Sequence, residues 1–186
     1  VNIGFGVVRD GKRRIQDMKD VWTDLLQRPH VVEALGPDFV MEDRHTAWPI
    51  PARIDEAITG SGRVLFVGDA AMATDTLTGE GIGQALLSGS LAAEAIIQGG
   101  LPVEVRNTYA QAVKHHLFAD HRMSNLLGRV LANERMARAA MRIIDGGTWR
   151  KQKFVRWMFE DEPRASALTP RRWHRGYLSS PGAYTK

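Results

Sequence analysis

The segment Gly62–Ile96, GRVLFVGDAAMATDTLTGEGIGQALLSGSLAAEAI, decides how this chain is interpreted. Its apolar run Val64–Val67 is typical of a strand covered on both faces, as in the sheet of an α/β protein. The run stops at Gly68, so we expect Asp69 at the carboxyl end of that strand, where open α/β sheets bind ligands. The segment therefore predicts a buried strand followed by an acidic turn at a ligand-binding edge.

A glycine-rich helix start follows this turn. Gly79, Gly81 and Gly83 alternate just before a run of small and apolar residues that predicts a helix to about Gly99. Without side chains at these positions, a ligand approaches bare backbone N–H groups, and the helix dipole favours negative charge there. The segment thus offers a carboxylate for ligand hydroxyl groups and amides for an anionic group.

The run GDAA followed by TGEGIGQAL resembles the second FAD-binding motif of flavoprotein oxidoreductases in the geranylgeranyl reductase family. More distantly it is similar to that of the flavin-dependent aromatic hydroxylases and halogenases. The resemblance implies that Asp69 accepts hydrogen bonds from the ribityl chain of FAD and that nearby amides face the pyrimidine end of the flavin ring. A helix N-terminus there stabilises the charge of the reduced flavin. The cofactor-binding residues expected on this basis are Gly68, Asp69, Ala70, Ala71, Gly79, Glu80, Gly81, Ile82 and Gly83.

The sequence departs from the family pattern before TGEG. The family usually has Asn or Asp, then Pro, then a bulky apolar residue, whereas this chain has Asp75, Thr76 and Leu77. Thr76 in place of proline loosens a turn that lies beside the flavin ring in relatives. Asp75 is a secondary candidate for a polar contact to cofactor or substrate. Glu80 is a candidate acid or base, although in relatives this glutamate belongs to the scaffold of the turn.

The resemblance also implies a position within a larger flavoprotein. FAD enzymes of this kind hold the pyrophosphate with a GxGxxG strand–turn–helix, and this sequence contains none. We therefore expect an α/β fold, here an α+β fragment: the C-terminal portion of a two-domain FAD-binding flavoprotein whose N-terminal FAD-binding half is missing. The expected parts are 1–50 in a substrate-binding domain, 51–100 in the FAD-binding domain, 101–160 as a helical region and 161–186 as a flexible tail, with the domain crossing near 47–52.

The implied activity is that of an FAD-dependent oxidoreductase. Hydride would pass from reduced FAD to a carbon–carbon double bond of an isoprenoid or polyprenyl lipid, and NAD(P)H or another donor would reduce FAD. No catalytic side chain is assigned, because the cofactor carries the difficult step. An FAD-dependent monooxygenase of the hydroxylase or halogenase type remains an alternative. A non-catalytic membrane-surface or partner-binding module is a second alternative if the chain acts alone, since the isolated chain is expected to be inactive.

Charge is distributed unevenly along the chain. Residues 1–100 contain 9 Lys or Arg and 14 Asp or Glu, whereas residues 101–186 contain 16 and 7. Within the basic half, 149–159 places Phe154, Trp157 and Met158 on one helical face beside basic side chains. That pattern is typical of a helix lying on anionic lipid, or of one that packs its aromatic face against its own domain. We expect a cytoplasmic protein with a peripheral contact at the inner face of the membrane.

Other partners are not expected from the sequence. The arginines of 122–142 are spread along a helix without a zinc-finger or RNA-binding signature, which argues against nucleic acid. The absence of cysteine excludes disulfides and thiolate catalysis. His115, His116 and His121 lack the spacing that brings helical metal ligands together, so we expect them on a solvated helix surface.

Periodicity and breakers predict the remaining elements. We expect a strand over 1–9 with a turn at Asp10–Gly11, and an extended segment over 39–51. The expected helices are 15–28, 31–35, 103–144 as one helix or two stacked helices with a bend at Gly128, and 149–159.

Overall fold

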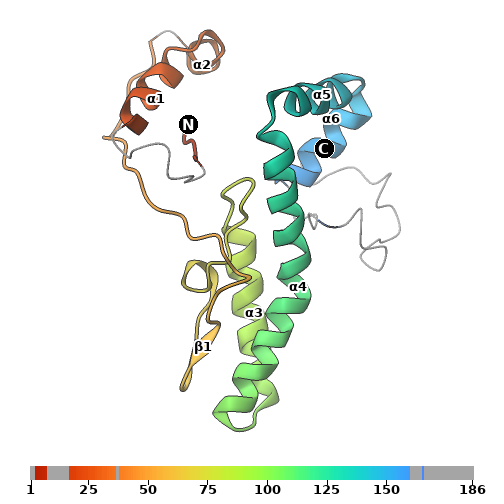
Figure 1. Ribbon diagram of the computed structural model, residues 1–186. Coiled ribbons are helices and arrows are strands. Elements are labelled where there is room, and N and C mark those ends of the chain that lie inside the picture. The colour runs from red at the N-terminus through yellow and green to blue at the C-terminus, as the bar shows by residue number, and fades with distance from the viewer. Residues whose placement is uncertain (1–2, 8–16, 37, 160–164, 166–186) are drawn as a thin grey trace. The chain divides into compact units, whose positions relative to one another are not determined.

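The computed structural model describes residues 3–7, 17–36, 38–159 and 165 (Figure 1). The chain divides into two compact units, Val1–Pro49 and Ile50–Lys186. This division falls inside the 47–52 segment where we expected the chain to cross between domains. The fold is of the α+β type, mainly helical with a small antiparallel sheet.

The first unit contains two short helices, α1 (Asp17–Leu26) and α2 (Pro29–Leu35). Both were expected, and Pro29 begins the second helix while Gly36, with φ +86°, ends it. The predicted strand over 1–9 is wrong for 3–7, which has no regular secondary structure. The described part of this unit holds no strand to pair with it, and Phe5 instead stacks on Trp22 with ring centroids 5.8 Å apart. The rest of 1–9 and the Asp10–Gly11 turn lie outside the described residues.

The second unit begins with a β-hairpin. β1 (Gly60–Ser61) pairs with β2 (Val64–Leu65) in antiparallel register. The prediction of a strand covered on both faces over Val64–Val67 is wrong, because only its first two residues pair and Val64 is 55% exposed. An apolar run shows a tendency to be buried but not what lies on either side of it.

Two long helices form the body of this unit. The turn η1 (Gly68–Ala71) leads to α3 (Ile82–Gln98), which packs along α4 (Pro102–Leu131) (Figure 1). The end of α3 before Gly99 agrees with the sequence prediction, whereas its start at Ile82 places Gly83 inside the helix rather than before it. Their buried hydrophobic core consists of Ile54, Ala71, Ala73, Leu91, Ala92, Ala95, Tyr109, Val113 and Leu117.

Tyr109 joins α4 to the end of the hairpin strand. Its side chain is fully buried, and its hydroxyl donates a hydrogen bond of 2.7 Å to the carbonyl oxygen of Phe66. Burial raises the pKa of the Tyr109 hydroxyl, and a hydrogen bond with Ser88 opposes that rise. The backbone that leads into the GDAA turn is therefore tied to the helical core.

The predicted 103–144 segment consists of two helices, α4 and α5 (Glu134–Asp145). The break falls at Ala132–Asn133, whereas α4 continues through Gly128. Asn133 determines this place, since its side-chain oxygen accepts hydrogen bonds from the N–H groups of Arg135 and Met136 at 3.0 and 3.3 Å. None of the helices in the described ranges is long and apolar enough to cross a membrane.

The last helix, α6 (Thr148–Phe159), packs against α5. It confirms the helix predicted over 149–159. The tail predicted over 161–186 lies outside the described residues except for Ala165. That residue is buried, and its N–H donates a hydrogen bond of 2.8 Å to the carboxylate of Asp120 on α4.

Candidate functional site

The GDAA turn packs directly on α3 because its first residue is glycine. Gly68 has φ +54°, and a Cβ added there would lie 3.1 Å from the Cβ of Ala85. Its N–H donates a hydrogen bond of 2.9 Å to Ser88 Oγ on α3. Of the residues that follow, Asp69 and Ala70 are exposed, whereas Ala71 is buried in the core. Ala71 therefore serves packing, and Asp69 is the side chain that the turn presents.

The structure brings Asp69 to the start of α3. Thr74 Oγ1 donates a hydrogen bond of 3.0 Å to Asp69 Oδ1. A Cβ added at Gly81 would lie 3.6 Å from the same carboxylate oxygen and 3.2 Å from Thr74 Oγ1. The two ends of the sequence motif thus meet, and a side chain at Gly81 would crowd the Thr74 hydroxyl that bonds to this carboxylate.

The N-terminus of α3 is open. Gly81 is its N-cap, no side chain caps the helix, and its first turn contains no acidic residue. The first N–H groups of a helix have no acceptor within the helix, so at α3 they remain available to an anionic group. Ile82 is exposed and Gly83 half-buried at this opening, and Gly79 precedes it with φ +74°.

Asp75 holds the loop between the turn and α3. Its buried carboxylate accepts hydrogen bonds from the N–H and hydroxyl of Thr78, at 3.0 and 2.7 Å, and from the hydroxyl of Ser124 on α4. Its own N–H donates to the carbonyl oxygen of Glu80 at 2.8 Å. Asp75 therefore shapes the loop from inside and links it to α4, whereas the side chain of Glu80 is exposed.

Two buried polar atoms of this segment have no hydrogen-bond partner in the described structure. They are Thr76 Oγ1, in the loop where the family usually has proline, and Gln84 Oε1, in the first turn of α3. Leaving a buried polar atom unpaired costs free energy, so each such atom in a folded chain requires an explanation. A ligand or solvent molecule bound at this opening would supply the missing hydrogen-bond partner.

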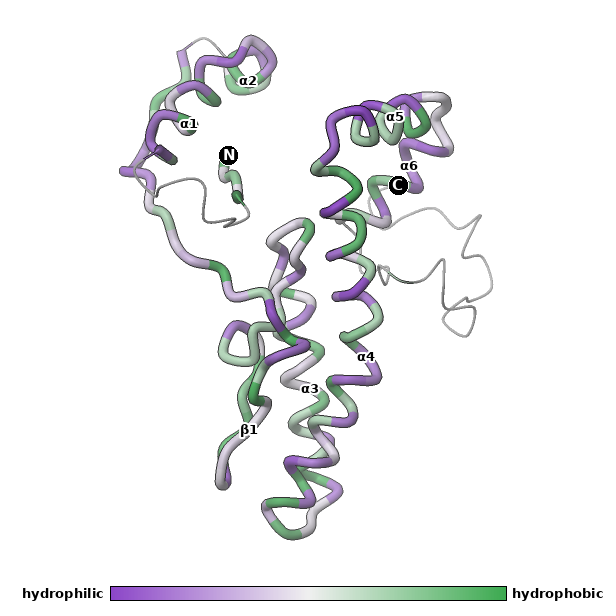
Figure 2. The backbone as a smooth tube through the Cα atoms, in the orientation of Figure 1, coloured by the Kyte–Doolittle hydropathy of each residue, from purple (hydrophilic) through white to green (hydrophobic). Residues whose placement is uncertain are grey.

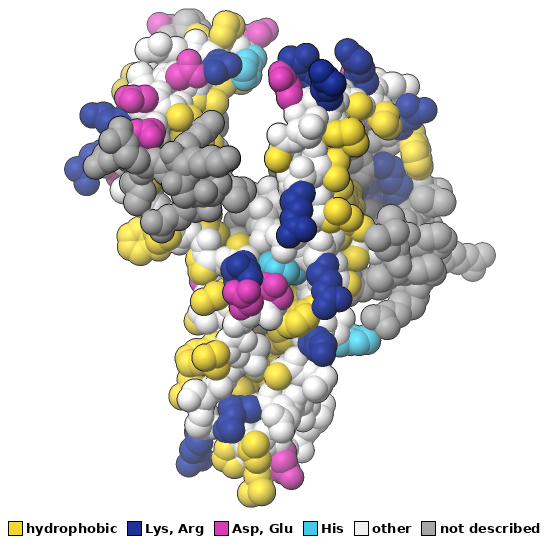
Figure 3. All heavy atoms as spheres, in the orientation of Figure 1, with side chains coloured by type: hydrophobic (Ala, Val, Ile, Leu, Met, Phe, Trp, Pro, Cys, Tyr) yellow, Lys and Arg dark blue, Asp and Glu magenta, His cyan; other side chains and the backbone are white. Residues whose placement is uncertain are grey.

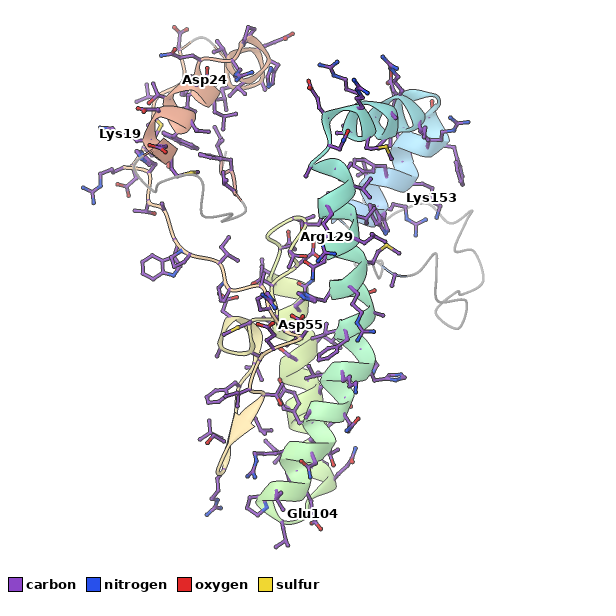
Figure 4. All side chains as sticks on the ribbon, viewed as in Figure 1. Lys19, Asp24, Asp55, Glu104, Arg129 and Lys153 are labelled. Atoms are coloured by element: carbon purple, nitrogen blue, oxygen red, sulfur yellow. The ribbon has the colours of Figure 1, made fainter. Side chains whose placement is uncertain are left out.

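A second polar cluster joins the loop before β1 to α4. His121 is only 5% exposed, so the expectation of a solvated side chain is wrong. Its Nε2 lies 2.9 Å from Asp55 Oδ1 and 2.9 Å from Asn125 Nδ2. Figure 4 labels Asp55, which lies in the loop before β1. Burial acts to raise the pKa of Asp55, but His121 and Arg53 outweigh it and hold that pKa below 3.8.

The other two histidines are placed as expected. His115 and His116 are exposed on α4, with their rings 5.0 Å apart in an edge-to-face arrangement. Across the described ranges, no group of three or more acidic or histidine side chains is arranged to hold a metal ion. His121 belongs to the packing of the second unit.

Sequence reasoning missed the residues that support Asp69. Thr74, Ser88 and Ser124 carry hydroxyl groups that bond the turn, the loop and the helices to one another. Their common signal is a small polar residue within a segment that is otherwise packed or apolar. Such a residue, when buried, needs a hydrogen-bond partner, but the sequence does not say which one.

Comparison of the chain with models of known protein families, with curated proteins and with solved structures found no match. The site is therefore interpreted from its own geometry. An exposed carboxylate can accept hydrogen bonds from the hydroxyl groups of a ligand. The N–H groups of the uncapped, glycine-lined helix start beside it can donate hydrogen bonds to an anionic edge of the same ligand.

Proposed function

We propose that this chain provides the flavin-contacting part of an FAD-dependent oxidoreductase. The observation that carries the proposal is the meeting of the Asp69 carboxylate with the uncapped start of α3 at Gly81. The ribityl linker of FAD carries hydroxyl donors, and its ring carries a polar edge that becomes electron-rich on reduction. One ligand of this kind satisfies both halves of the site.

The residues present fit such a group. The backbone at Gly81 is bare where a Cβ would crowd Thr74, and the buried oxygens of Thr76 and Gln84 have no partner among the described residues. Of the nine residues expected from sequence, Asp69 and 79–83 lie at this opening. Gly68 and Ala71 support the turn from the inside.

Each side chain then has a limited task. The flavin, when bound, supplies the hydride-transfer chemistry. Asp69 binds and orients the linker, and Thr74 keeps its carboxylate in place by donating to Oδ1. The amides at the start of α3 stabilise negative charge at the edge of the ring. Asp75, through Ser124, holds the loop in the shape that leaves this opening accessible.

The outer face of α3 supports a further part of the same proposal. Leu86 and Ile97 are 72% and 82% exposed, and a Cβ added at Gly89 between them would meet nothing within 4 Å. Large apolar side chains that gather on one face of a helix are normally buried. In the described structure β2 also has a neighbour on one edge only. We propose that the dinucleotide-binding half of the flavin domain covers α3 and β2 and holds the pyrophosphate.

The substrate belongs to the apolar class in this proposal. The first unit carries a shallow groove of about 640 Å³ lined by Trp22, Thr23, Leu26, Gln27, Val32, Phe39 and His45. Such a lining favours an isoprenoid or polyprenyl chain over a charged substrate. Anaerobic oxidation of the reduced holoenzyme by an unsaturated polyprenyl lipid supports the reductase. Turnover that requires O₂ and yields a hydroxylated aromatic would establish the monooxygenase alternative instead.

The flavin site can be tested on the chain itself. FAD is titrated into the isotopically labelled protein, and backbone amide resonances are followed by NMR. We expect weak binding with the largest shifts at Asp69 and 81–84, because the pyrophosphate-holding half is not part of the site described here. Asp69→Asn should abolish these shifts, and Glu94→Gln, an exposed carboxylate farther along α3, should leave them unchanged.

Two results would contradict the proposal. Shifts absent from 69 and 81–84 at saturating FAD would remove the flavin site. Tight, stoichiometric binding would keep that site but overturn the assignment of the pyrophosphate to a covering half.

A further inference from the structure

Helix α5 presents three parallel rows of side chains. Positions separated by three and four residues share one face of a helix. The row Ala137, Ala140 and Ile144 is half-buried. The next row around the helix, Met136, Ala139 and Ile143, is exposed. The third row, beside it, is Arg135, Arg138 and Arg142.

The middle row is exposed in the part of the chain that the structure describes. Met136 is 51% exposed and Ile143 62%. In Figure 3, Lys and Arg side chains gather over α5 next to hydrophobic ones. An apolar strip with arginines along one edge is the composition of a helix that lies in the interface of a membrane, with its apolar row among the acyl chains and its cations at the phosphates.

The charge around the strip favours an anionic partner. Helices α5 and α6 together carry seven Lys or Arg and two Asp or Glu. Both acidic side chains are already paired, Glu134 with Arg138 and Asp145 with Lys151. The surface is therefore strongly cationic, and its positive charge is concentrated beside exposed apolar groups.

The aromatic face of α6 is less exposed than this row. Phe154, Trp157 and Met158, the residues for which we expected a lipid contact, are half-buried, and the rings of Phe154 and Trp157 lie 6.5 Å apart. Partial burial is what the other interpretation of the pattern, packing within the chain, predicts. The exposed apolar row belongs to the preceding helix.

We propose that α5 binds the surface of anionic phospholipid bilayers through Met136, Ala139 and Ile143, with Arg135, Arg138 and Arg142 at the headgroup phosphates. A nucleic acid would use the arginines but not the apolar row beside them, so the strip favours lipid. The proposal goes beyond the flavin site and does not depend on it. An interfacial contact of this kind would hold the protein where long isoprenoid chains reside.

The test is co-sedimentation of the full chain, without FAD, with vesicles of phosphatidylcholine alone or mixed equally with phosphatidylglycerol. We expect binding to the mixed vesicles only, weakened by salt. The double variant Met136→Asp/Ile143→Asp should lower the partition coefficient by roughly tenfold or more. Arg135→Glu/Arg142→Glu should lower it by at least about 25-fold, at about fivefold for each cation lost.

Matched controls separate the surface from general charge. Val40→Asp/Ile58→Asp adds the same charge at exposed apolar positions elsewhere, and Arg44→Glu/Lys114→Glu reverses two exposed cations outside α5. Neither α5 nor its fold should be perturbed by them, and circular dichroism checks that all variants retain their helices. Binding that falls equally in the control and α5 variants would overturn the proposal.

Two further outcomes would also overturn it. One is the absence of binding to phosphatidylglycerol vesicles at low salt. The other is competition by double-stranded DNA together with wild-type binding by Met136→Asp/Ile143→Asp, which would identify a site for polyanions in general. Loss of flavin binding in the NMR experiment would leave the vesicle result unaffected, so the two proposals fail separately.

Discussion

Helices α3 and α4 pack against each other, yet their outward faces differ. Along α4 the exposed side chains include Lys114, His115 and Arg122. Along α3 they include Leu86 and Ile97. Figure 2 shows few hydrophilic residues on α3 and many on α4.

The outward face of α4 is polar, as expected for a face in contact with water, whereas the outward face of α3 exposes large apolar side chains. A helix with one apolar and one polar face is satisfied by one packing partner, and α4 fits that description. Helix α3 carries large apolar side chains on its outward face as well, and its contact with α4 leaves Leu86 and Ile97 exposed. The proposed flavin site lies at the start of the helix whose outer face carries these exposed apolar side chains.

The largest effect on stability should come from truncating a side chain on the face of α3 that packs in the core. Leu91→Ala should destabilise the chain by about 2–5 kcal/mol, because Leu91 is buried in the core and its removal leaves a cavity. Leu86→Ala, the same change on the outer face, should stay within about 0.5 kcal/mol. Urea unfolding measures both. Equal losses would mean that the outer face is already covered.

The next largest loss of stability should come from removing the hydrogen bond between α4 and the loop that joins η1 to α3. Ser124→Ala removes a hydroxyl that donates to the buried carboxylate of Asp75, and we expect a loss of about 1–3 kcal/mol. Ser90→Ala, on the exposed side of α3, is the matched control and should be close to neutral. The same unfolding measurement applies. A neutral Ser124→Ala would show that Asp75 holds the loop without α4.

Two glycines sharpen the contrast between the faces of α3. Gly68→Ala forces a side chain into a positive-φ position 3.1 Å from Ala85 and should cost about 1–2 kcal/mol. Gly89→Ala lies within the helix with open space around it and should stabilise the chain by about 0.5–1 kcal/mol. Thermal unfolding followed by circular dichroism compares the two. A stabilising Gly68→Ala would contradict the close packing of the GDAA turn.

The smallest effect should be that of pH on the Asp55–His121 contact. The pKa of Asp55 in the folded chain lies below 3.8, so its contribution is present above that value and is lost as pH falls through the lower, folded pKa. The carboxylate is partly exposed, which keeps the contribution small. Asp55→Asn should therefore flatten the acid limb of the stability curve, measured by urea unfolding from about pH 5 down to about pH 2.

The control for this prediction is the ion pair between Asp145 at the end of α5 and Lys151 on α6, which is exposed. Lys151 lowers the pKa of Asp145 by a hydrogen bond and by its charge, but that pair is in water. Asp145→Asn should leave the acid limb unchanged. Equal effects of the two substitutions would indicate that burial of His121 contributes nothing to the Asp55 contact.

Much of the local structure could be predicted from the sequence because local chemistry decides it. Gly99 ends α3, Pro29 begins α2, and the periodicity of α6 places its aromatic residues on one face. Each of these depends on residues only a few positions apart. The same holds for the expected meeting of an acidic turn with a glycine-rich helix start, since both belong to one short segment.

Tertiary structure alone decided which side chains are buried and what they contact. The sequence could not show that His121 packs against Asp55, that Asp75 bonds to Ser124, or that Val64 remains exposed. These contacts form only when segments distant in the chain come together. The local sequence pattern around a residue does not show which distant residue will contact it. Local preferences determined the helices and their ends, whereas tertiary packing determined the partners that hold Asp69 at the start of α3.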